Sequence, residues 1–193
     1  MEGGGEARHC GGARGDCRAI HPTTPSRPRG RCRLRERSLP LGIVATDLDS
    51  GAAILFERGD AGQAVRASSA VPAIYQPVKI GGREYVDGGL VSPVPVRFAR
   101  QMGAEMVVAV DISSPPDGNN TGDTLKLLLQ TFAIMGKSIN QFELRDADVV
   151  LRPALTGVSS ADFTSRVRAI RAGREMATQM LPEIRAKLLA LAR

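Results

Sequence analysis

The sequence predicts an α/β fold in which part of the sheet is parallel. After residue 90, apolar stretches of strand length alternate with helical patterns, which is typical of strands joined by helical crossovers. Before residue 90 the apolar runs are short and are separated by turns rich in Gly and Asp, as in antiparallel hairpins. The chain has 193 residues and a hydrophobic content of 42%, which is enough for one domain of ordinary size.

Two hairpins are expected in the first part of this domain. The strand candidates Leu41–Asp47 and Ala53–Phe56 are joined by a link with turn chemistry. Pro77–Ile80 and Arg83–Val86 flank Gly81-Gly82, which is a two-residue hairpin signal. These patterns predict antiparallel pairing on both sides of a short intervening helix.

That intervening helix is expected over residues 61–70, with Asp60 as its N-cap and Pro72 beyond its end. Ser92 with Pro93 predicts the start of a second helix, which ends at Gly103. Glu105–Ile112 is the next strand candidate, because it is apolar and β-branched.

The C-terminal third is expected to be mainly helical. A helix capped by Asp123 or Thr124 should run to about Leu144, with an apolar stripe that we interpret as core. In a truncated domain, part of this core would lack its covering and leave an exposed apolar surface. A strand over residues 147–151 follows. Asp162 is expected to open a helical tail, with Pro182 in the first turn of its last helix.

Residues 1–38 differ in composition from the rest of the chain. They hold 9 Arg and 4 acidic residues, a net charge of +5, whereas residues 39–193 have a net charge of +1. They are rich in Gly, Arg and Pro and show no strand or helix period, so we expect a disordered tail outside the fold. Residues 39–193 form the expected domain. The Arg-rich stretch 27–37 has no interleaved aromatic residues, so we favour a solvated tail over nucleic-acid binding.

All Cys and His residues also lie in this first segment, so residues 39–193 contain neither type. The domain therefore cannot hold a zinc site of Cys and His, a Cys nucleophile or a triad with a His base. Any hydrolytic chemistry must use a carboxylate or a lysine as the base. No apolar run approaches the roughly 20 residues of a membrane-spanning helix, and no signal-peptide pattern is visible, so a cytoplasmic location is expected.

Two acidic motifs stand at expected strand ends. Asp87-Gly88-Gly89 is by itself an ordinary turn, in which Gly tolerates positive φ, but catalytic carboxylates are also held at such places. Asp47 and Asp49 could be a metal pair, and we favour a turn with Asx hydrogen bonds. We expect no metal and no cofactor.

Four stretches in order resemble the patatin-like phospholipase family from about Leu41 to Ile112. They are VATDLDSG, AVRASSAVPAIYQPV, VDGG and MGAEMVVAVDIS, which begin at Val44, Ala64, Val86 and Met102. The resemblance implies a three-layer α/β/α fold with a partly parallel central sheet, and hydrolysis of lipid or other acyl esters by a Ser-Asp dyad. It assigns Asp87 as the general base and Gly88 and Gly89 as the turn that presents it. A lipid substrate also implies peripheral contact with a membrane.

The sequence departs from the family pattern in its nucleophile. No G-x-S-x-G motif is present, and only 40 residues precede Leu41. We therefore expect a domain truncated on its N-terminal side and inactive by itself. The GGARG sequence at residues 11–15 resembles part of the family's oxyanion loop, and we interpret it as chance. Ser68 could be a substitute nucleophile, but a packing or capping role is favoured. The alternative is a non-catalytic regulatory or binding module.

Overall fold

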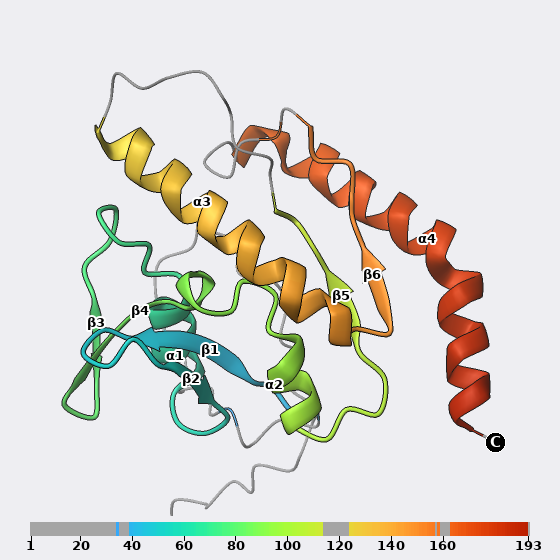
Figure 1. The fold of residues 1–193 in the computed structure, drawn as a ribbon, viewed down its shortest axis with the longest axis horizontal. Helices are drawn as coiled ribbons and strands as arrows, with labels where there is room; N and C mark the ends of the chain where they lie inside the picture. Colours follow the sequence, from blue (N-terminus) through green and yellow to red (C-terminus); the bar gives the residue numbers. More distant parts are fainter. Residues whose placement is uncertain (1–33, 35–38, 114–123, 157, 159–162, 193) are drawn as a thin grey trace, which may run out of the picture. The chain divides into compact units, whose positions relative to one another are not determined.

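The computed structural model describes Leu34 and residues 39–113, 124–156, 158 and 163–192. The expected disordered tail, residues 1–38, lies outside these ranges except for Leu34, which is buried and donates its backbone N–H to Gly59 O. The GGARG sequence, Asp123 and Asp162 also lie outside the described residues. The described elements are shown in order in Figure 1.

Four strands form one antiparallel sheet in the order β2-β1-β4-β3. They are β1 (Ile43–Asp47), β2 (Ala53–Phe56), β3 (Val78–Ile80) and β4 (Arg83–Asp87). Both predicted hairpins are confirmed, β1 with β2 and β3 with β4. Gly81 and Gly82 have φ angles of 59° and 82°, which is the left-handed conformation that the two-residue turn requires. β1 also pairs with β4, so both hairpins belong to the sheet that carries Asp87.

Helix α1 (Ala61–Ser68) packs against this sheet and closes the first hydrophobic core. Its predicted N-cap is confirmed, because Asp60 Oδ1 accepts hydrogen bonds from the backbone N–H groups of Gly62 and Gln63 at 2.8 and 3.1 Å. The Phe56 ring meets the Tyr85 ring edge to face, with centroids 5.1 Å apart. The buried members of this core are Ala45, Ala67, Ala70, Val78 and Tyr85.

A parallel pair of strands, β5 (Val108–Val110) and β6 (Val149–Leu151), confirms an α/β fold with partly parallel pairing. Among the described strands this pair is a sheet of its own. The Asp148 carboxylate joins it to α2 (Val96–Gln101), since Oδ2 lies 2.6 Å from both Arg100 Nη2 and Val107 N. The second core lies here and contains Val94, Val96, Val107 and Ala109.

Helix α2 begins at Val96, four residues after the predicted start at Ser92. The Ser92 N–H is used earlier, because it donates to Gly88 O at 2.9 Å and so extends the 3₁₀ turn η2 (Gly88–Leu90). Pro93 and Pro95 follow, and neither has an N–H with which to continue that turn. The chain therefore turns once more before the helix begins.

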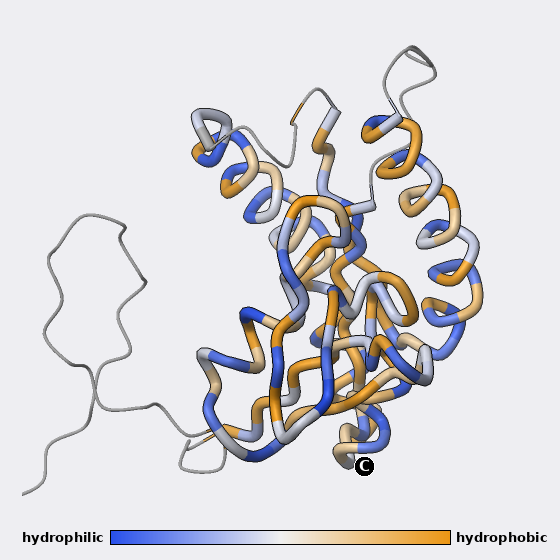
Figure 2. The backbone as a smooth tube through the Cα atoms, turned by 90° about the vertical axis from the view of Figure 1, so that its left-hand side faces the viewer, coloured by the Kyte–Doolittle hydropathy of each residue, from blue (hydrophilic) through white to orange (hydrophobic). Residues whose placement is uncertain are grey.

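The long helices are α3 (Thr124–Glu143) and α4 (Arg166–Leu191), along which hydrophobic and hydrophilic residues alternate (Figure 2). The 3₁₀ turns η3 (Leu144–Asp146) and η4 (Phe163–Ser165) adjoin them. No described helix combines the length and the apolar content that a membrane crossing needs.

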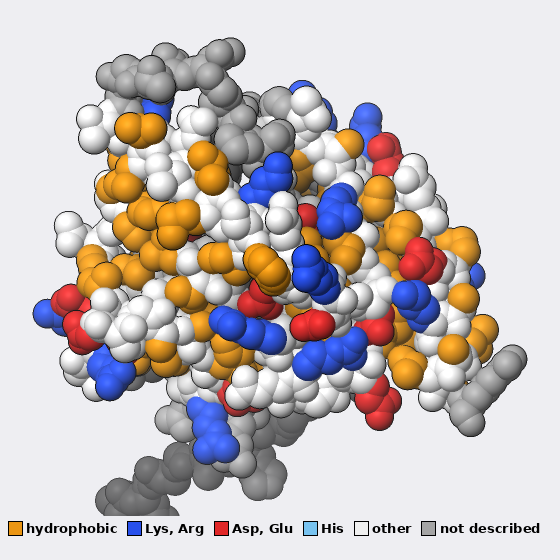
Figure 3. Space-filling view, viewed as in Figure 1, with side chains coloured by type: hydrophobic (Ala, Val, Ile, Leu, Met, Phe, Trp, Pro, Cys, Tyr) orange, Lys and Arg blue, Asp and Glu red, His pale blue; other side chains and the backbone are white. Residues whose placement is uncertain are grey.

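Several residues of the α3 stripe are exposed rather than buried in a core. Leu125, Leu128 and Met135 are 42%, 38% and 51% exposed, and hydrophobic side chains gather over α3 on the face drawn in Figure 3. The buried residues of α3 are polar, Asn140 and Glu143. They are buried because they meet two serines on other segments, which the periodicity of a single helix does not reveal.

The prediction that Pro182 starts a new helix is also wrong, because Pro182 lies inside α4. Proline removes one backbone hydrogen bond and crowds the preceding turn, so it kinks a helix. Figure 1 shows that α4 bends part-way along its length. None of the residues of α4 is buried, so solvent can satisfy the carbonyl that Pro182 leaves unpaired.

Candidate active site

The Asp87 side chain stands where β4 ends and η2 begins. Its Oδ1 accepts a hydrogen bond of 2.7 Å from Gly89 N, so the carboxylate caps the turn that follows it. The Asp87 backbone is held on both sides, since its N–H donates to Ala70 O and its carbonyl accepts from Thr46 Oγ1 at 2.7 Å. The carboxylate therefore has a fixed position at the end of a rigid strand.

Burial raises the pKa of the Asp87 carboxyl above its usual range, and the hydrogen bond from the Gly89 N–H partly opposes the shift. Desolvation destabilises the charged form, whereas a donor to the carboxylate stabilises it. A carboxylate with a raised pKa is a stronger base than a solvated one. The environment of Asp87 therefore suits it to accept a proton.

Gly88 is required for a different reason from the one that the sequence suggests. No positive φ is found at Gly88 or Gly89, so the expected left-handed turn is absent there. A Cβ on Gly88 would instead lie 2.3 Å from Val44 O, because the turn passes directly against β1. A Cβ on Gly89 would meet only the Asp87 carboxylate, at 3.1 Å from Oδ1.

A cavity of about 240 Å³ lies beside the Asp87 carboxylate. Its wall is mostly apolar and is built from the segment after α1, the segment after η2 and the middle of α3. These apolar residues are Val71, Pro72, Leu90, Pro93, Phe132 and Ala133. Ser113 and Lys137 are its polar residues besides Asp87. An apolar cavity that ends at a basic carboxylate suits a ligand with a hydrocarbon part and a reacting polar group.

Helix α3 is anchored to the Asp87 turn by a buried carboxylate. Glu143 Oε1 accepts a hydrogen bond from Ser92 Oγ at 2.8 Å and lies 3.2 Å from Arg97 Nε. Ser92 is in turn hydrogen-bonded through its backbone to Gly88. Sequence reasoning did not identify Glu143 as a site-building residue. The feature of the sequence that could have indicated Glu143 is that it is the one acidic residue in α3.

The Asp47 carboxylate forms the predicted Asx turn. Its Oδ1 accepts from Asp49 N, Ser50 N and Ser50 Oγ, while Oδ2 lies 2.7 Å from Arg83 Nη1. Backbone donation from Ser50 and the Arg83 guanidinium lower the pKa of Asp47 to about 2. Within the described residues no group of three or more His, Cys, Asp and Glu side chains could hold a metal ion.

Comparison with known proteins finds a family match for part of the chain. Residues 22–100 match the model of the patatin-like phospholipase family. This segment of the chain is similar to that family. It includes Asp87 and the two glycines after it, although the comparison does not test the role of any residue.

The relatives are longer than this chain. An uncharacterised NTE family protein of Mycobacterium tuberculosis is 33% identical over 89 residues, 46% of this chain and 25% of the relative. A second such protein of the same species is 26% identical over 170 residues, which covers 74% of this chain and 29% of the relative. Lysophospholipase NTE1 of Debaryomyces hansenii is 31% identical over 83 residues, 42% of this chain and 5% of the relative. The chain thus spans less than a third of each of these relatives.

Proposed function

We propose that this chain carries the general-base part of a patatin-like lipid acyl hydrolase, with Asp87 as the base. The observation that carries the proposal is a fixed carboxylate with a raised pKa at the end of an apolar cavity. The family match and the relative named lysophospholipase support hydrolysis of lipid esters.

In this mechanism Asp87 accepts the proton of a serine hydroxyl as that oxygen attacks the ester carbonyl. The C–O bond forms, negative charge develops on the carbonyl oxygen, and backbone N–H groups stabilise it. Collapse of this intermediate expels the alcohol, which takes a proton from the Asp87 carboxyl. Water then releases the fatty acid from the serine by the same steps in reverse order.

The sequence contains no G-x-S-x-G motif, so we propose that this chain by itself has no serine hydrolase activity. A fluorophosphonate probe applied to the purified chain tests this, since the probe labels activated serines. We expect no labelling. Stoichiometric labelling of a serine would overturn the proposal, and the Ser113→Ala variant would show whether the exposed serine in the Asp87 cavity is the one labelled.

The base role needs a complete enzyme, so residues 22–100 can replace the matching segment of Debaryomyces Lysophospholipase NTE1. We expect Asp87→Asn to lower kcat of the graft by about 10²-fold or more, because general-base catalysis contributes about 10²–10⁴-fold. Glu57→Gln is the matched control, since Glu57 is an exposed carboxylate in the same segment. An active graft that tolerates Asp87→Asn would refute the base role.

A lipid substrate brings the protein to a lipid surface, and we propose that α3 makes this contact. Leu125, Leu127 and Leu128 in its first turns are all exposed. Co-flotation with phosphatidylcholine vesicles tests the contact. We expect replacement of these three residues by Ser to abolish co-flotation, and co-flotation that persists would refute it.

The second candidate function is a non-catalytic binding module for another patatin-like protein. It is favoured by β5, whose Val108 and Val110 are 39% and 49% exposed while Ala109 between them is buried. Among the described strands β5 pairs only with β6, so its other edge is a template for pairing with a further strand. A pull-down with a full-length relative tests this candidate. The candidate is excluded if the chain does not associate with the full-length relative. It is also excluded if association persists in the double variant Val108→Thr, Val110→Thr.

A further inference from the structure

Helix α4 packs against β6 with one face and is open to solvent on the other (Figure 1). Ala169, Met176 and Met180 are partly buried and follow the helical period, which marks the face toward β6. None of the residues of α4 is fully buried. The outer face of this 26-residue helix therefore has no partner within the part of the chain that the structure describes.

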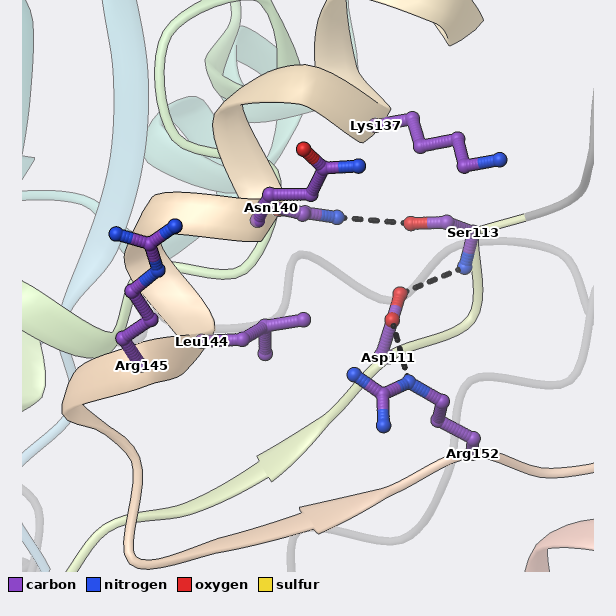
Figure 4. A pocket seen from close by; sticks show the side chains of 8 residues that line it. Asp111, Ser113, Lys137, Asn140, Leu144, Arg145 and Arg152 are labelled. Atoms are coloured by element: carbon purple, nitrogen blue, oxygen red, sulfur yellow. Dashed lines mark hydrogen bonds and ion pairs between the residues drawn. The ribbon is translucent and has the colours of Figure 1, made fainter.

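The strands under α4 are held at both ends of β6. Asp148, directly before β6, accepts a hydrogen bond of 2.6 Å from Arg100 Nη2, and its carbonyl accepts one from Lys187 on α4. Arg152, directly after β6, has its Nε 3.2 Å from Asp111 Oδ2 at the end of β5 (Figure 4). The inner face of α4 thus rests on a fixed support, and the outer face takes no part in these contacts.

An apolar seam with a seven-residue repeat runs along α4. In a heptad written abcdefg, the a and d positions form the contact line of a coiled coil. When the repeat starts with Val167 at a, the a and d positions hold Val167, Ile170, Arg174, Ala177, Leu181, Ile184, Leu188 and Leu191. Six of these eight residues are large and apolar, and five of the six are exposed. A repeat sustained over more than three heptads predicts pairing with another helix.

The width of this seam favours a helix over a lipid surface as its partner. A helix that lies in a membrane interface has a broad apolar face, whereas a stripe confined to a and d is the narrower contact line of a coiled coil. The e and g positions flank that line. Apart from Met180, which is partly buried, they hold Arg166, Arg171, Gly173, Thr178, Arg185, Lys187 and Ala192. The apolar stripe of α4 is therefore bounded on both sides.

The charges beside the seam select an acidic partner. Four of the eight e and g positions are cationic and none is acidic, the cations being Arg166, Arg171, Arg185 and Lys187. The acidic residues of α4, Glu175 and Glu183, lie at b and c. The three arginines form no ion pair with any residue that the structure describes. Because e and g residues of paired helices face each other, these cations favour a partner with carboxylates beside its own seam.

Arg174 gives an independent indication of the same partner. It lies at an a position, within the seam, and it too has no ion pair among the described residues. A partner helix would cover it, and a covered guanidinium needs a carboxylate beside it. In a parallel pair of identical helices, a positions face each other, so Arg174 would meet itself. The flanking positions would also bring cations together in either orientation, so a second copy of this chain fits poorly.

We propose that the outer face of α4 is a docking surface for an acidic helix of another protein. The partner helix has an apolar seam with the same repeat, carboxylates on both sides of it, and one carboxylate opposite Arg174. Pro182 lies at a b position, so its ring stays out of the contact and the seam continues on both sides of the bend. This surface is independent of the role of Asp87, because the residues that line the Asp87 cavity include none from α4.

A labelled peptide of about four heptads, with Leu at a and d and Glu at e and g, tests the surface. The same peptide with Lys at e and g is its control, and fluorescence anisotropy measures binding of each to the full chain. We expect the Glu peptide to bind about tenfold more tightly or better, because opposite charges attract and like charges repel across the contact. The double variant Arg171→Glu, Arg185→Glu should reverse this preference. Equal binding of the two peptides would overturn the proposal.

Leu188→Ser and Leu189→Ser are a matched pair of variants. The two side chains are 51% and 68% exposed, but Leu188 lies in the seam and Leu189 at a b position outside it. We expect Leu188→Ser to weaken binding of the Glu peptide by about tenfold or more, because burial of a Leu side chain contributes at least that much. Leu189→Ser should change the affinity by less than about threefold. Equal losses would show non-specific apolar attraction and overturn the seam.

Two further measurements test the other possible occupants of α4. Flotation with vesicles that contain phosphatidylserine measures attachment to an anionic lipid surface, and sedimentation of the chain alone measures self-association. We expect both to be the same in Leu188→Ser and in the original chain. If Leu188→Ser releases the chain from the vesicles, α4 binds a membrane. If it dissociates a dimer, α4 binds a second copy, and either result would overturn the acidic helix as the partner.

Discussion

Replacing Gly88 by Ala places a methyl group where the turn after Asp87 crosses strand β1. The new Cβ would lie 2.3 Å from Val44 O and 2.8 Å from Val44 C. Both are backbone atoms of a strand that pairs with β2 on one side and β4 on the other. The contact can therefore be relieved only by moving the sheet or the turn.

The size of the loss follows from this geometry. Non-bonded atoms need about 3.5 Å, so the turn and β1 must separate by about 1 Å. Overpacking a well-packed interior costs about 1–3 kcal/mol, and more where the backbone must move. We expect Gly88→Ala to cost about 3 kcal/mol or more of the total stability, which is about 5–15 kcal/mol for a natural domain. The midpoint of thermal unfolding should fall by about 6–12 °C.

Circular dichroism during thermal and urea unfolding measures this loss, and Gly89→Ala is the matched control. Its Cβ would meet only the Asp87 side chain, at 3.1 Å from Oδ1. This contact is longer than the one at Gly88 and involves a side chain, for which a displacement of a few tenths of an ångström is enough, so the loss should stay below about 1 kcal/mol. The argument from close approach is refuted if the free energy of unfolding of Gly88→Ala is within about 0.5 kcal/mol of that of the original chain. It is also refuted if both variants lose the same amount of stability.

Two further predictions concern the buried carboxylates. The pKa of Asp47 is about 2 in the folded chain, below its unfolded value of 3.8, so its contribution to stability should be present above about pH 4 and be lost as pH falls toward 2. Urea midpoints measured across this range should fall less steeply in Asp47→Asn, and identical slopes would contradict the prediction. In a double-mutant cycle, Ser92→Ala and Glu143→Ala should show a coupling of about 1–3 kcal/mol, because their hydrogen bond is buried. A coupling near zero would show that Glu143 does not anchor the Asp87 turn.

Features that depend on neighbouring residues were well predicted. Gly81-Gly82 indicates a tight turn because few other residues adopt its backbone angles, and Asp60 indicates a helix start because its side chain replaces a missing acceptor. The Asp47 turn is local in the same way, since its oxygen reaches N–H groups two and three residues ahead. The position of Asp87 at a strand end follows from these patterns.

The predicted helix start and the predicted burial differ from the structure where groups distant in the sequence form hydrogen bonds or contacts. The start of α2 shifted because Ser92 donates to Gly88 and to Glu143, which is 51 residues away in sequence. The stripe of α3 indicates an apolar face, but which of its residues are buried depends on what faces the helix, and the pattern of one helix does not contain that information.

The sequence by itself determined the resemblance of Leu41–Ile112 to the patatin-like family. It also determined the two hairpins, the capped helix and the Asp-Gly-Gly turn, since each of these rests on interactions within a few residues. The tertiary structure alone decided why residue 88 must be Gly, why the pKa of Asp87 rises, and how α3 brings Lys137 to the Asp87 cavity. Those features depend on contacts between segments that are separated along the chain. Desolvation and steric contact act through space, so chain order does not encode them directly.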